Sequence, residues 1–366
     1  MQADHARRLI DRLRSHGPLV GSSFELDAAR YRSQAWFERE QPLRELPRIV
    51  ATSSSIAPGE CMPFGSAVLA RDAAGTLRAF ANACRHRGTR LVDKPCATKA
   101  FVCPYHGWTY GLDGALLHVP HAEAFGGAEV GRNLVELPAS EHHGLIWLGD
   151  GVPAHVGPLG ADLAALGAER LVTFRASSTR RRCNWKFLVE AFLDGYHIRT
   201  LHRDSIYRFF MDAASLAEPV GDHIRAVTAR RALKDGAADA PARDLVTPSL
   251  FVFPATTIVE HPDFISILTA HARGPEHTDF DHLMLVPADR IGETEHWQKS
   301  WDLIEGVVFQ REDQWVCEEM QHGLDTGVDR LLFGKLEHGV RWFHDSIDAV
   351  TARPGDRRAD TLAASR

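Results

Sequence analysis

The sequence has no run of eighteen apolar residues, so no segment has the length and hydropathy of a transmembrane helix, and we expect no membrane span. The first fifteen residues are charged throughout and lack the apolar core of a signal peptide. There is no excess of basic residues either, because 42 Lys and Arg stand against 48 Asp and Glu. Nucleic-acid binding needs a concentrated positive surface, and the one densely basic run, Arg180–Arg182, is interpreted as solvated. These absences predict a cytoplasmic protein that binds neither membrane nor nucleic acid.

Cysteine is scarce, with six residues in a chain of 366. In a chain without an export signal, so few cysteines indicate metal ligands or buried thiols rather than a disulfide framework. We expect Cys96 to be a buried structural thiol. A nucleotide fingerprint is missing as well, since Gly126-Gly127 is not followed by the pattern of a dinucleotide-binding turn. Any redox chemistry that starts from a nicotinamide cofactor would therefore depend on a separate protein.

The texture of the sequence divides the chain into an all-β part and a mixed part, which together predict an α+β fold. The length allows two ordinary domains, and 44% of the residues are hydrophobic. Residues 5–14 have apolar positions at helical spacing and predict a short helix. Between 47 and 150, short apolar runs alternate with Gly, Pro and Asp turns, which is typical of closely spaced β-strands. These runs are Ser66–Arg71, Leu77–Asn82, Phe101–Cys103 and Leu145–Leu148.

The second part of the chain begins after Gly151–Gly167, a stretch rich in Gly, Pro and Ala that predicts a connector. A helix is expected over Asn184–Tyr196 and a long helix from about Thr294 to His322. The tail after Arg353 is rich in Arg, Asp and Ala and is expected to be disordered. The predicted strands are Leu171–Ser178, Leu250–Val259, Phe264–Ala272 and Asp281–Pro287.

Two short segments each supply one cysteine and one histidine. Cys84 and His86 are followed by Cys103 and His106, in the pattern C-x-H-x16-C-x2-H. Thiolate is a soft, charged donor for iron and bridging sulfide, whereas neutral imidazole carries no charge, so an iron–sulfur cluster with two of each has a raised potential. One Cys and one His from each loop would let the same two loops hold both irons. A zinc site is the alternative, although zinc fingers favour closely spaced pairs of like ligands and each pair here is mixed.

With Arg87-Gly88 and Gly107-Trp108 beside the ligands, the two segments resemble the Rieske domain of the aromatic ring-hydroxylating oxygenase alpha subunits. The resemblance implies one [2Fe–2S] cluster per chain, held by the four Cys and His ligands. Respiratory Rieske proteins add a disulfide between the two loops, at positions that Thr89 and Tyr105 occupy here. This departure fits the oxygenase branch of Rieske proteins.

A second group of candidate ligands lies within residues 184–202. Glu190, Asp194 and His197 are spaced i, i+4, i+7 and share one stripe of the expected helix, among apolar neighbours. Charged groups in such a helix are costly unless they are paired or coordinated. His202 lies about 140° from His197 on an ideal helix, so both reach one ion only if the chain bends or leaves the helix. The alternative is a pair of core histidines beside a structural salt bridge.

Two histidines and one carboxylate form the facial triad of non-heme iron oxygenases. The carboxylate must come from elsewhere, and the expected long helix offers Glu312 and Asp313. We favour Asp313, because it is the only charge in a helical stripe with Phe309, Val316 and Met320. Glu312 instead shares its stripe with a second glutamate.

The start Asn184-Trp-Lys and the core Asp194-Gly-Tyr-His197 resemble the same oxygenase family. By that resemblance His197, His202 and Asp313 bind one catalytic mononuclear Fe(II) per chain.

The resemblance also implies a homotrimer, in which Asp194 links His106 of one chain to His197 of the next and electrons cross the subunit interface. The stretch Glu312–Leu324 looks most like the branch without beta subunits, which includes choline-, glycine betaine- and carnitine-type monooxygenases. The chain departs from that branch around Val328–Lys335.

In this family an N-terminal all-β Rieske domain precedes a helix-grip catalytic domain, in which an antiparallel sheet holds a long C-terminal helix. The expected parts are a helical segment at 1–46 that packs on the catalytic domain, the Rieske domain at 47–150, the catalytic domain at 151–352 and a disordered tail at 353–366.

The implied function is that of a terminal oxygenase component, which uses O2 and electrons from a separate reductase to mono- or dioxygenate a small organic substrate. The reductase would be an NAD(P)H-dependent flavin or iron–sulfur protein, acting directly or through a ferredoxin. An oxidative N- or O-demethylase or quaternary-amine monooxygenase is the alternative within the family. A Rieske electron carrier without oxygenase activity and a zinc scaffold are less favoured.

A quaternary ammonium ligand needs an aromatic cage, yet the chain has only 5 Tyr and 8 Trp and none of them cluster in its second half. We therefore expect an aromatic or carboxylated substrate, as in aromatic hydrocarbon catabolism. The residues expected to line its pocket are Phe210, Phe251, Phe253, Ile258, Ile267 and Phe309.

Overall fold

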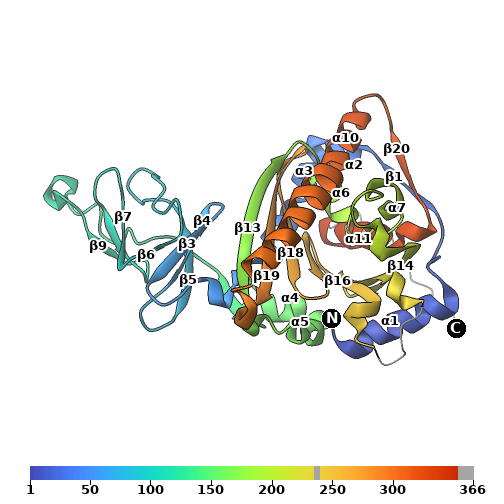
Figure 1. Cartoon of the computed structure of the whole chain (residues 1–366). Helices are drawn as coiled ribbons and strands as arrows, with labels where there is room; N and C mark the ends of the chain where they lie inside the picture. Colours follow the sequence, from blue (N-terminus) through green and yellow to red (C-terminus); the bar gives the residue numbers. More distant parts are fainter. Residues whose placement is uncertain (235–239, 353–366) are drawn as a thin grey trace. The chain divides into compact units, whose positions relative to one another are not determined.

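A computed structural model describes residues 1–234 and 240–352, which divide into two units (Figure 1). The smaller unit comprises Pro47–Gly157 and Gly167–Thr173, and the larger comprises Met1–Leu46, Pro158–Leu166 and the described residues from Phe174 onward. The tail predicted to be disordered lies outside the described residues. None of the described helices combines the length and the hydropathy that a bilayer span requires.

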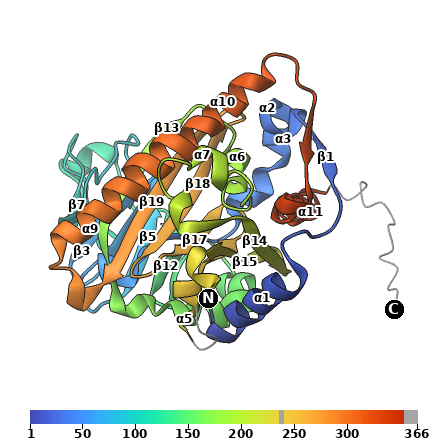
Figure 2. The ribbon, with the colours of Figure 1, turned by 45° about the vertical axis from the view of Figure 1, so that its right-hand side comes forward.

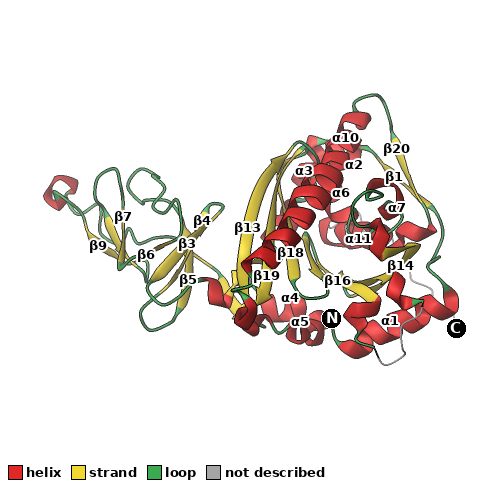
Figure 3. Cartoon of the chain, in the orientation of Figure 1, coloured by secondary structure: helices red, strands yellow, loops and turns green. Residues whose placement is uncertain are grey.

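The smaller unit consists almost entirely of short strands and loops (Figure 3). Its sheets have the strand orders β10-β5-β4-β3-β6, β11-β12-β2 and β7-β8-β9. All four runs predicted as strands are confirmed, as β4, β5, β7 and β12. The strands are β2 Arg48–Thr52, β3 Glu60–Phe64, β4 Ala67–Arg71, β5 Leu77–Ala81, β6 Cys96–Ala97, β7 Ala100–Val102, β8 Thr109–Gly111, β9 Leu116–His118, β10 Glu136–Leu137, β11 Ala139–His142 and β12 Leu145–Leu148, with 3-10 turns at Ser53–Ser55, Ala122–Phe125 and Ala168–Arg170.

Strand β4 lies at the centre of this unit because both of its faces are buried. Val68 and Ala70 pack in one apolar cluster, whereas Ala67 and Leu69 pack in another, as the alternation of a strand requires. The first cluster also contains both cysteines of the C-x-H and C-x2-H motifs. The sheet therefore fixes the base of the two candidate ligand loops.

The larger unit contains a seven-stranded sheet with the order β13-β19-β18-β17-β16-β15-β14. Strands β14 to β19 follow one another in antiparallel pairs. The predicted strand over Leu250–Val259 is two strands, β16 and β17, and neither β14 nor β15 was predicted. The strands are β13 Leu171–Arg181, β14 Phe210–Val220, β15 His223–Arg230, β16 Val246–Val252, β17 Thr256–Glu260, β18 Ile265–Gly274 and β19 His277–Pro287, and a separate pair joins β1 Phe24–Asp27 to β20 Arg330–Phe333.

A continuous helical rod crosses one face of this sheet (Figure 2). It consists of α9 Thr294–Trp301, a π-helical middle η9 Asp302–Asp313 and α10 Gln314–Leu324. The long helix is thus confirmed, but its π-helical middle was not predicted. Because π-turns occur frequently at functional sites, this segment is a natural place for a ligand. The sheet with its crossing helix, together with the all-β unit, confirms the α+β fold with a helix-grip arrangement.

The remaining helices belong to the larger unit, except α4, which lies within the smaller unit. Helix α1 contacts β14 and β15, and α11 contacts the same two strands. Gly151–Gly167, expected as a connector, is mostly helical. The helices are α1 Ala3–His16, α2 Ala29–Arg32, α3 Gln34–Arg39, α4 Val152–Val156, α5 Gly160–Leu166, α6 Trp185–Glu190, α7 Ile198–Leu201, α8 Ala242–Leu245 and α11 His338–Thr351, with 3-10 turns at Gln41–Glu45, Gly157–Leu159, Tyr207–Phe209, Arg231–Leu233, Ala288–Arg290 and Lys335–Glu337.

The prediction of one helix over Asn184–Tyr196 was wrong, because α6 ends at Glu190. Beyond it the chain passes close to β14, where a Cβ at Gly195 would collide with the side chain of Ser215. Glycine at this position lets the chain turn tightly against the strand before α7 begins. After this turn, the positions of the residues beyond Glu190 no longer follow the i, i+4, i+7 pattern of a helix.

Candidate metal centres and substrate cavity

Two loops of the same form carry the cysteines and histidines of the smaller unit. Gly88 N donates to Cys84 O at 2.9 Å, and Gly107 N donates to Cys103 O at 3.0 Å. The two glycines have φ angles of 80° and 72°, in the left-handed region that favours glycine. The tight turn after each cysteine brings the following histidine back beside it.

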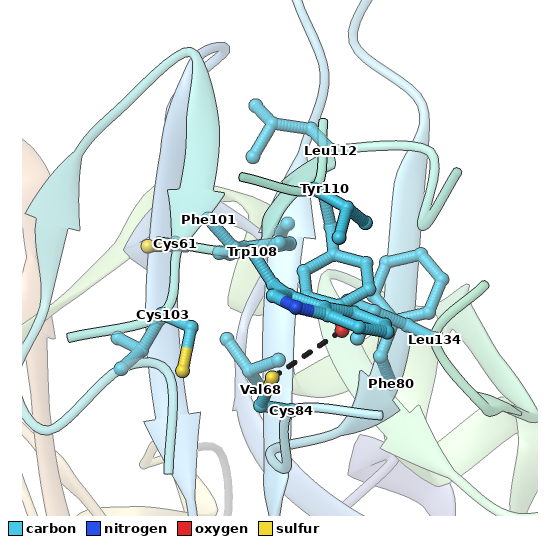
Figure 4. Close-up of a cluster of buried hydrophobic side chains, with 13 residues drawn as sticks. Cys61, Val68, Phe80, Cys84, Phe101, Cys103, Trp108, Tyr110, Leu112 and Leu134 are labelled. Carbon is cyan, nitrogen blue, oxygen red and sulfur yellow. Dashed lines mark hydrogen bonds between the residues drawn. The ribbon is translucent and has the colours of Figure 1, made fainter. Parts of the chain in front are cut away.

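The four side chains of these loops form two pairs, one of imidazoles and one of thiols. His86 Nδ1 and His106 Nδ1 lie 3.1 Å apart. The sulfur atoms of Cys84 and Cys103 face each other (Figure 4), and the two residues are each 3% exposed. Trp108 links the two pairs, because it stacks on His86 and packs in the same cluster as both cysteines. Two sulfur donors and two imidazoles are the donor set of a Rieske cluster. These residues fit a [2Fe–2S] cluster.

The surroundings of the sulfur atoms favour the ligating form of the thiols. Burial raises the pKa of the Cys103 thiol, but hydrogen bonds from the backbone of Tyr105 and His106 and from the side chains of Cys84 and Thr89 together outweigh burial, and the pKa lies below its ordinary value. A lower pKa favours thiolate, which is the form that binds metal. Tyr110 Oη lies 3.4 Å from Cys84 Sγ and can donate to it.

Trp108 closes one side of this site. Its ring is buried and stacks on His86, with 5.0 Å between ring centroids and 6° between planes. Phe125 meets both rings edge-on. These contacts hold His86 in one orientation and keep water from that side of the ring.

The expectation that Cys96 is a buried structural thiol was wrong, because its side chain is exposed. It lies on β6 directly opposite Cys61 of β3, with 3.3 Å between the two Sγ atoms. Burial and the neighbouring Cys96 thiol raise the pKa of Cys61 to about 12. The edge position of β6 in its sheet explains the exposure.

In the larger unit, two histidines and one aspartate from distant segments converge. His197 precedes α7, His202 follows it, and Asp313 is the last residue of the π-helical segment. The two Nε2 atoms lie 3.2 Å apart, and Asp313 Oδ1 lies 3.1 Å from His202 Nε2 and 3.7 Å from His197 Nε2. The break in the helix that we expected between the histidines was wrongly placed. The chain leaves the helix at the end of α6, before His197, and the two histidines lie at the two ends of the short helix α7.

The opposite nitrogen of each histidine ring faces a carboxylate. His197 Nδ1 lies 3.2 Å from Asp194 Oδ2, and His202 Nδ1 lies 2.7 Å from Glu312 Oε2. Ser205 Oγ also donates to Glu312 Oε2 at 2.7 Å. A carboxylate on Nδ1 fixes the tautomer with its proton there and leaves the Nε2 lone pair free to bind metal. Glu312, the alternative to Asp313, therefore touches His202 from the side away from the gathered atoms.

The donor atoms fit a cation. Asp313 Oδ1 is buried and forms no hydrogen bond with any described residue, although two Nε2 atoms lie close to it. Burial lowers the pKa of His202, but Asp313 and Glu312 outweigh burial and raise it. Two imidazole nitrogens and one unpaired carboxylate oxygen that lie this close together are suited to a divalent ion. Sets of two histidines and one carboxylate with open positions are typical of non-heme Fe(II).

Glu190, placed by sequence on the same stripe as Asp194 and His197, does not join this group. Its Oε1 accepts from Tyr31 Oη and His344 Nε2, both at 2.8 Å. The end of α6 at Glu190 explains the difference, because Asp194 and His197 lie beyond the helix and no longer share one of its faces with Glu190. Glu190 thus belongs to a buried network between α2, α6 and α11.

The gathered histidines open on a cavity of about 250 Å³. Of the six residues expected to line a pocket, Phe210 and Phe309 do so. The other four were wrong: Phe251, for example, packs edge-on against Phe343 of α11. The lining residues are Ala191, Phe192, Asp194, His197, Ile198, His202, Ile206, Phe209, Phe210, Thr228, Arg230, Thr247, Ser249, Val259, His261, Pro262, Phe264, Ser300, Leu303, Ile304, Val308, Phe309 and Asp313.

Several cavity residues were not predicted from the sequence. Arg230 and Thr228 lie on β15, a strand that was missed, and His261 follows β17. No local motif marks them, because they reach the cavity only through the pairing of the sheet. Ser205, which donates to Glu312 and does not line the cavity, was also not predicted. It lies three residues beyond His202 and could have been found from its proximity to the ligand motif.

Comparison with known proteins finds a matching family for each of the two parts of the chain. The profile of the ring hydroxylating alpha subunit catalytic domain matches residues 168–353, and that of the Rieske [2Fe-2S] domain matches residues 48–137. Together these matches imply a Rieske cluster and a mononuclear iron, the two groups that the donor sets fit.

Among proteins of similar sequence, the chloroplastic choline monooxygenase of Spinacia oleracea is 26% identical over 302 residues, which cover 76% of this chain and 65% of that protein. The chain thus spans less than two thirds of that relative's length. The large oxygenase component of the naphthalene 1,2-dioxygenase system of Pseudomonas fluorescens is 30% identical over 167 residues, covering 40% of this chain and 35% of that protein. The solved structure of the quaternary ammonium Rieske monooxygenase CntA has a TM-score of 0.77 at 18% identity, covering 93% of this chain and 98% of that one.

Proposed function

The chain belongs to the ring-hydroxylating alpha subunit family, and we propose that it is the terminal oxygenase component of a Rieske non-heme iron system. It would use O2 and electrons from a separate reductase to hydroxylate a small aromatic or carboxylated substrate. One observation carries this proposal: His197, His202 and Asp313 gather at the wall of a cavity, in a chain that also carries the Rieske ligand loops. When bound, the cluster supplies single electrons and the mononuclear iron supplies O2 activation.

The residues around the triad position its ligands. Asp194 and Glu312 hold the two imidazoles from their Nδ1 sides, so that both Nε2 atoms point to one centre. Three protein donors on one side leave the other side free for substrate and O2. Phe192 and Phe309 are in edge-on contact and make the nearby wall apolar, which excludes water from the reacting atoms.

The electron supply and the assembly are also part of the proposal. A partner reductase, NAD(P)H-dependent and built on flavin or an iron–sulfur cluster, would load the cluster directly or through a ferredoxin. We propose a homotrimer of the branch without beta subunits, in which Asp194 connects His197 to His106 of the neighbouring subunit. The 19% exposure of the Asp194 side chain leaves it accessible for such a contact. The expected domain boundaries and the cytoplasmic location stay predictions.

The second candidate is a quaternary-amine monooxygenase or demethylase of the same family. It is supported by the similarity to choline monooxygenase and to CntA, whose names state those activities. Both candidates use the same metal ligands and differ in the group that the cavity binds. A Rieske electron carrier would have no need of the triad.

The test is product formation from O2. The protein, loaded with iron and sulfide, is supplied with NADH and a surrogate reductase, and 18O from labelled O2 is followed into the products of an aromatic, carboxylated and quaternary-amine panel. Incorporation of label supports the proposal. A colourless protein with stoichiometric zinc, or a reducible cluster without any label in product, would reject it.

His197→Ala provides the matched test of the triad. It is expected to lose mononuclear iron and product while keeping the visible spectrum of the cluster. His322→Ala, on the exposed side of α10, is the control and should keep both. Product formation by His197→Ala at the normal rate would remove the triad from the mechanism.

A further inference from the structure

Arg230 is the only Lys or Arg among the described residues that line the cavity. It ends β15, opposite Phe210 of β14, and its guanidinium lies over the rings of Phe209 and Phe210 at 5.9 and 5.7 Å from their centroids. Its one side-chain hydrogen bond to a described residue goes to Thr247 Oγ1 and is long, at 3.4 Å. A guanidinium has five N–H donors, so most of its bonding capacity is left over.

No described carboxylate forms an ion pair with Arg230. Burial lowers the pKa of Arg230, and the only carboxylate that opposes this effect, Asp244, is exposed and acts at a distance. Guanidinium groups stay protonated in proteins, so the charge persists. A partly buried charge is costly until an opposite charge pairs with it. The cavity therefore holds a cation whose partner is missing from the described part of the protein.

Next to Arg230 in the cavity wall, no other described residue carries a positive charge. His261 also lines the cavity, but its ring is half-buried and stacks on Phe264, 4.1 Å between centroids, and its Nε2 contacts Ser266 Oγ at 3.2 Å. Burial, with nearby His282, lowers the pKa of His261 to about 3, so the ring is neutral at physiological pH. It can offer a hydrogen bond beside the guanidinium but no charge.

The rest of the cavity suits a flat apolar body of small size. Phe192, Phe264, Leu303, Val308 and Phe309 supply apolar side chains to its wall. The volume of about 250 Å³ is below the roughly 300–1,000 Å³ of pockets for drug-sized ligands, so a single-ring compound is the appropriate size.

We propose that Arg230 binds the carboxylate of the substrate, and that the site takes small aromatic carboxylates with the ring against the phenylalanines. This inference rests on the oxygenase function proposed above and narrows its substrate class. Guanidinium and carboxylate match in geometry and form paired, charge-assisted hydrogen bonds. A cation without a carboxylate, such as choline, would meet like charge at Arg230. Glycine betaine would keep the carboxylate but has no ring to lie against the phenylalanines.

The experiment measures binding to the iron-loaded protein by calorimetry, with benzoate, salicylate, their two amides, choline and glycine betaine as probes. The unmodified protein should bind at least one acid about ten- to a hundredfold more tightly than its amide, the range expected for hydrogen bonds to a charged group. Arg230→Met should abolish this difference while amide binding persists, and Arg230→Lys should keep part of it.

Arg231→Met is the matched control, because Arg231 follows directly in the chain but is exposed, and its Nε donates to Arg208 O at 2.9 Å. It should retain the full preference for the acid. Iron content and thermal melting check that each variant keeps its fold.

The inference is overturned if the unmodified protein binds none of the acids, binds acid and amide equally, or binds choline or glycine betaine more tightly than both acids. Persistence of the acid preference in Arg230→Met would overturn it as well. A failure of the oxygenase proposal gives a different pattern: the acid preference and its loss in Arg230→Met would be present, but no compound would yield labelled product.

Discussion

Replacing Glu312 by Gln tests how far the triad depends on a residue that does not belong to it. Glu312 Oε2 accepts from His202 Nδ1 and from Ser205 Oγ, each at 2.7 Å. The variant keeps the shape of the side chain but loses its charge. A hydrogen bond to a charged group contributes about 1.5–3 kcal/mol, and about 1.4 kcal/mol corresponds to a factor of ten. We therefore expect Fe(II) affinity at the triad to fall about 10- to 100-fold.

The assay titrates Fe(II) into cluster-loaded protein that lacks mononuclear iron, in competition with a coloured Fe(II) chelator. Glu319→Gln is the control, since Glu319 lies on the exposed side of the same helical rod. Asp313→Asn, which removes a ligand oxygen, should cost more than Glu312→Gln. Equal affinity of Glu312→Gln and the unmodified protein, or a larger loss in Glu312→Gln than in Asp313→Asn, would refute the assignment of the two carboxylates.

Three further predictions concern electron transfer and stability. Asp194→Asn, loaded at saturating Fe(II) because this carboxylate also holds the His197 ring, should contain both metal groups but lose product formation by about tenfold or more, and full turnover with normal iron content would contradict the bridging role. Glu40→Gln should lower the free energy of unfolding in urea by about 3–5 kcal/mol, because it leaves the buried Lys186 ammonium without its partner at 2.6 Å; a change below about 1 kcal/mol would contradict this. Burial raises the pKa of Asp162, but its hydrogen bonds, including one from Arg225, outweigh burial and hold that pKa below its ordinary value. The stabilisation that the ionised Asp162 carboxylate gives the folded protein should be complete above the unfolded pKa of about 3.9 and disappear as pH falls through the lower folded pKa. Asp162→Asn should therefore make the free energy of unfolding less dependent on pH in the acidic range.

The cluster ligands could be predicted from sequence because each pair lies within one short loop. Between Cys84 and His86, or between Cys103 and His106, the backbone has few ways to close, and a glycine with positive φ completes each turn. Donor type and spacing are then enough to indicate the site. Cys96 shows the limit of this reasoning, since its exposure depends on a two-residue edge strand that no local pattern indicates.

The carboxylate of the triad was harder to predict, because it depends on the register of a helix. Asp313 was chosen from an α-helical stripe that also contained Val316 and Met320, yet Met320 is 39% exposed. The buried positions beyond Asp313 are instead Gln314, Cys317, Gln321 and Leu324. The π-helical segment that ends at Asp313 changes the number of residues per turn, which a 3.6-residue period does not capture. Asp313 was still the better choice, because both carboxylates contact His202 but only Asp313 lies on the Nε2 side of its ring, whereas Glu312 lies at Nδ1.

The cavity could not be predicted, and the reason is topological. Arg230 and Phe210 face each other across β14 and β15, two strands whose alternation is broken by a register shift between Phe210 and Ser215. Ala213, within that shift, has a φ of 48°, so the local sequence does not follow the period of a regular strand. The charge that would select the substrate is therefore positioned by an irregular strand pair that follows the two histidine ligands in the chain. The same iron chemistry can in this way be kept while the substrate changes, because His197 and His202 are fixed by one local segment and Arg230 by another. A carboxylate preference that followed Arg230, with iron affinity unchanged, would show the two functions to be separable.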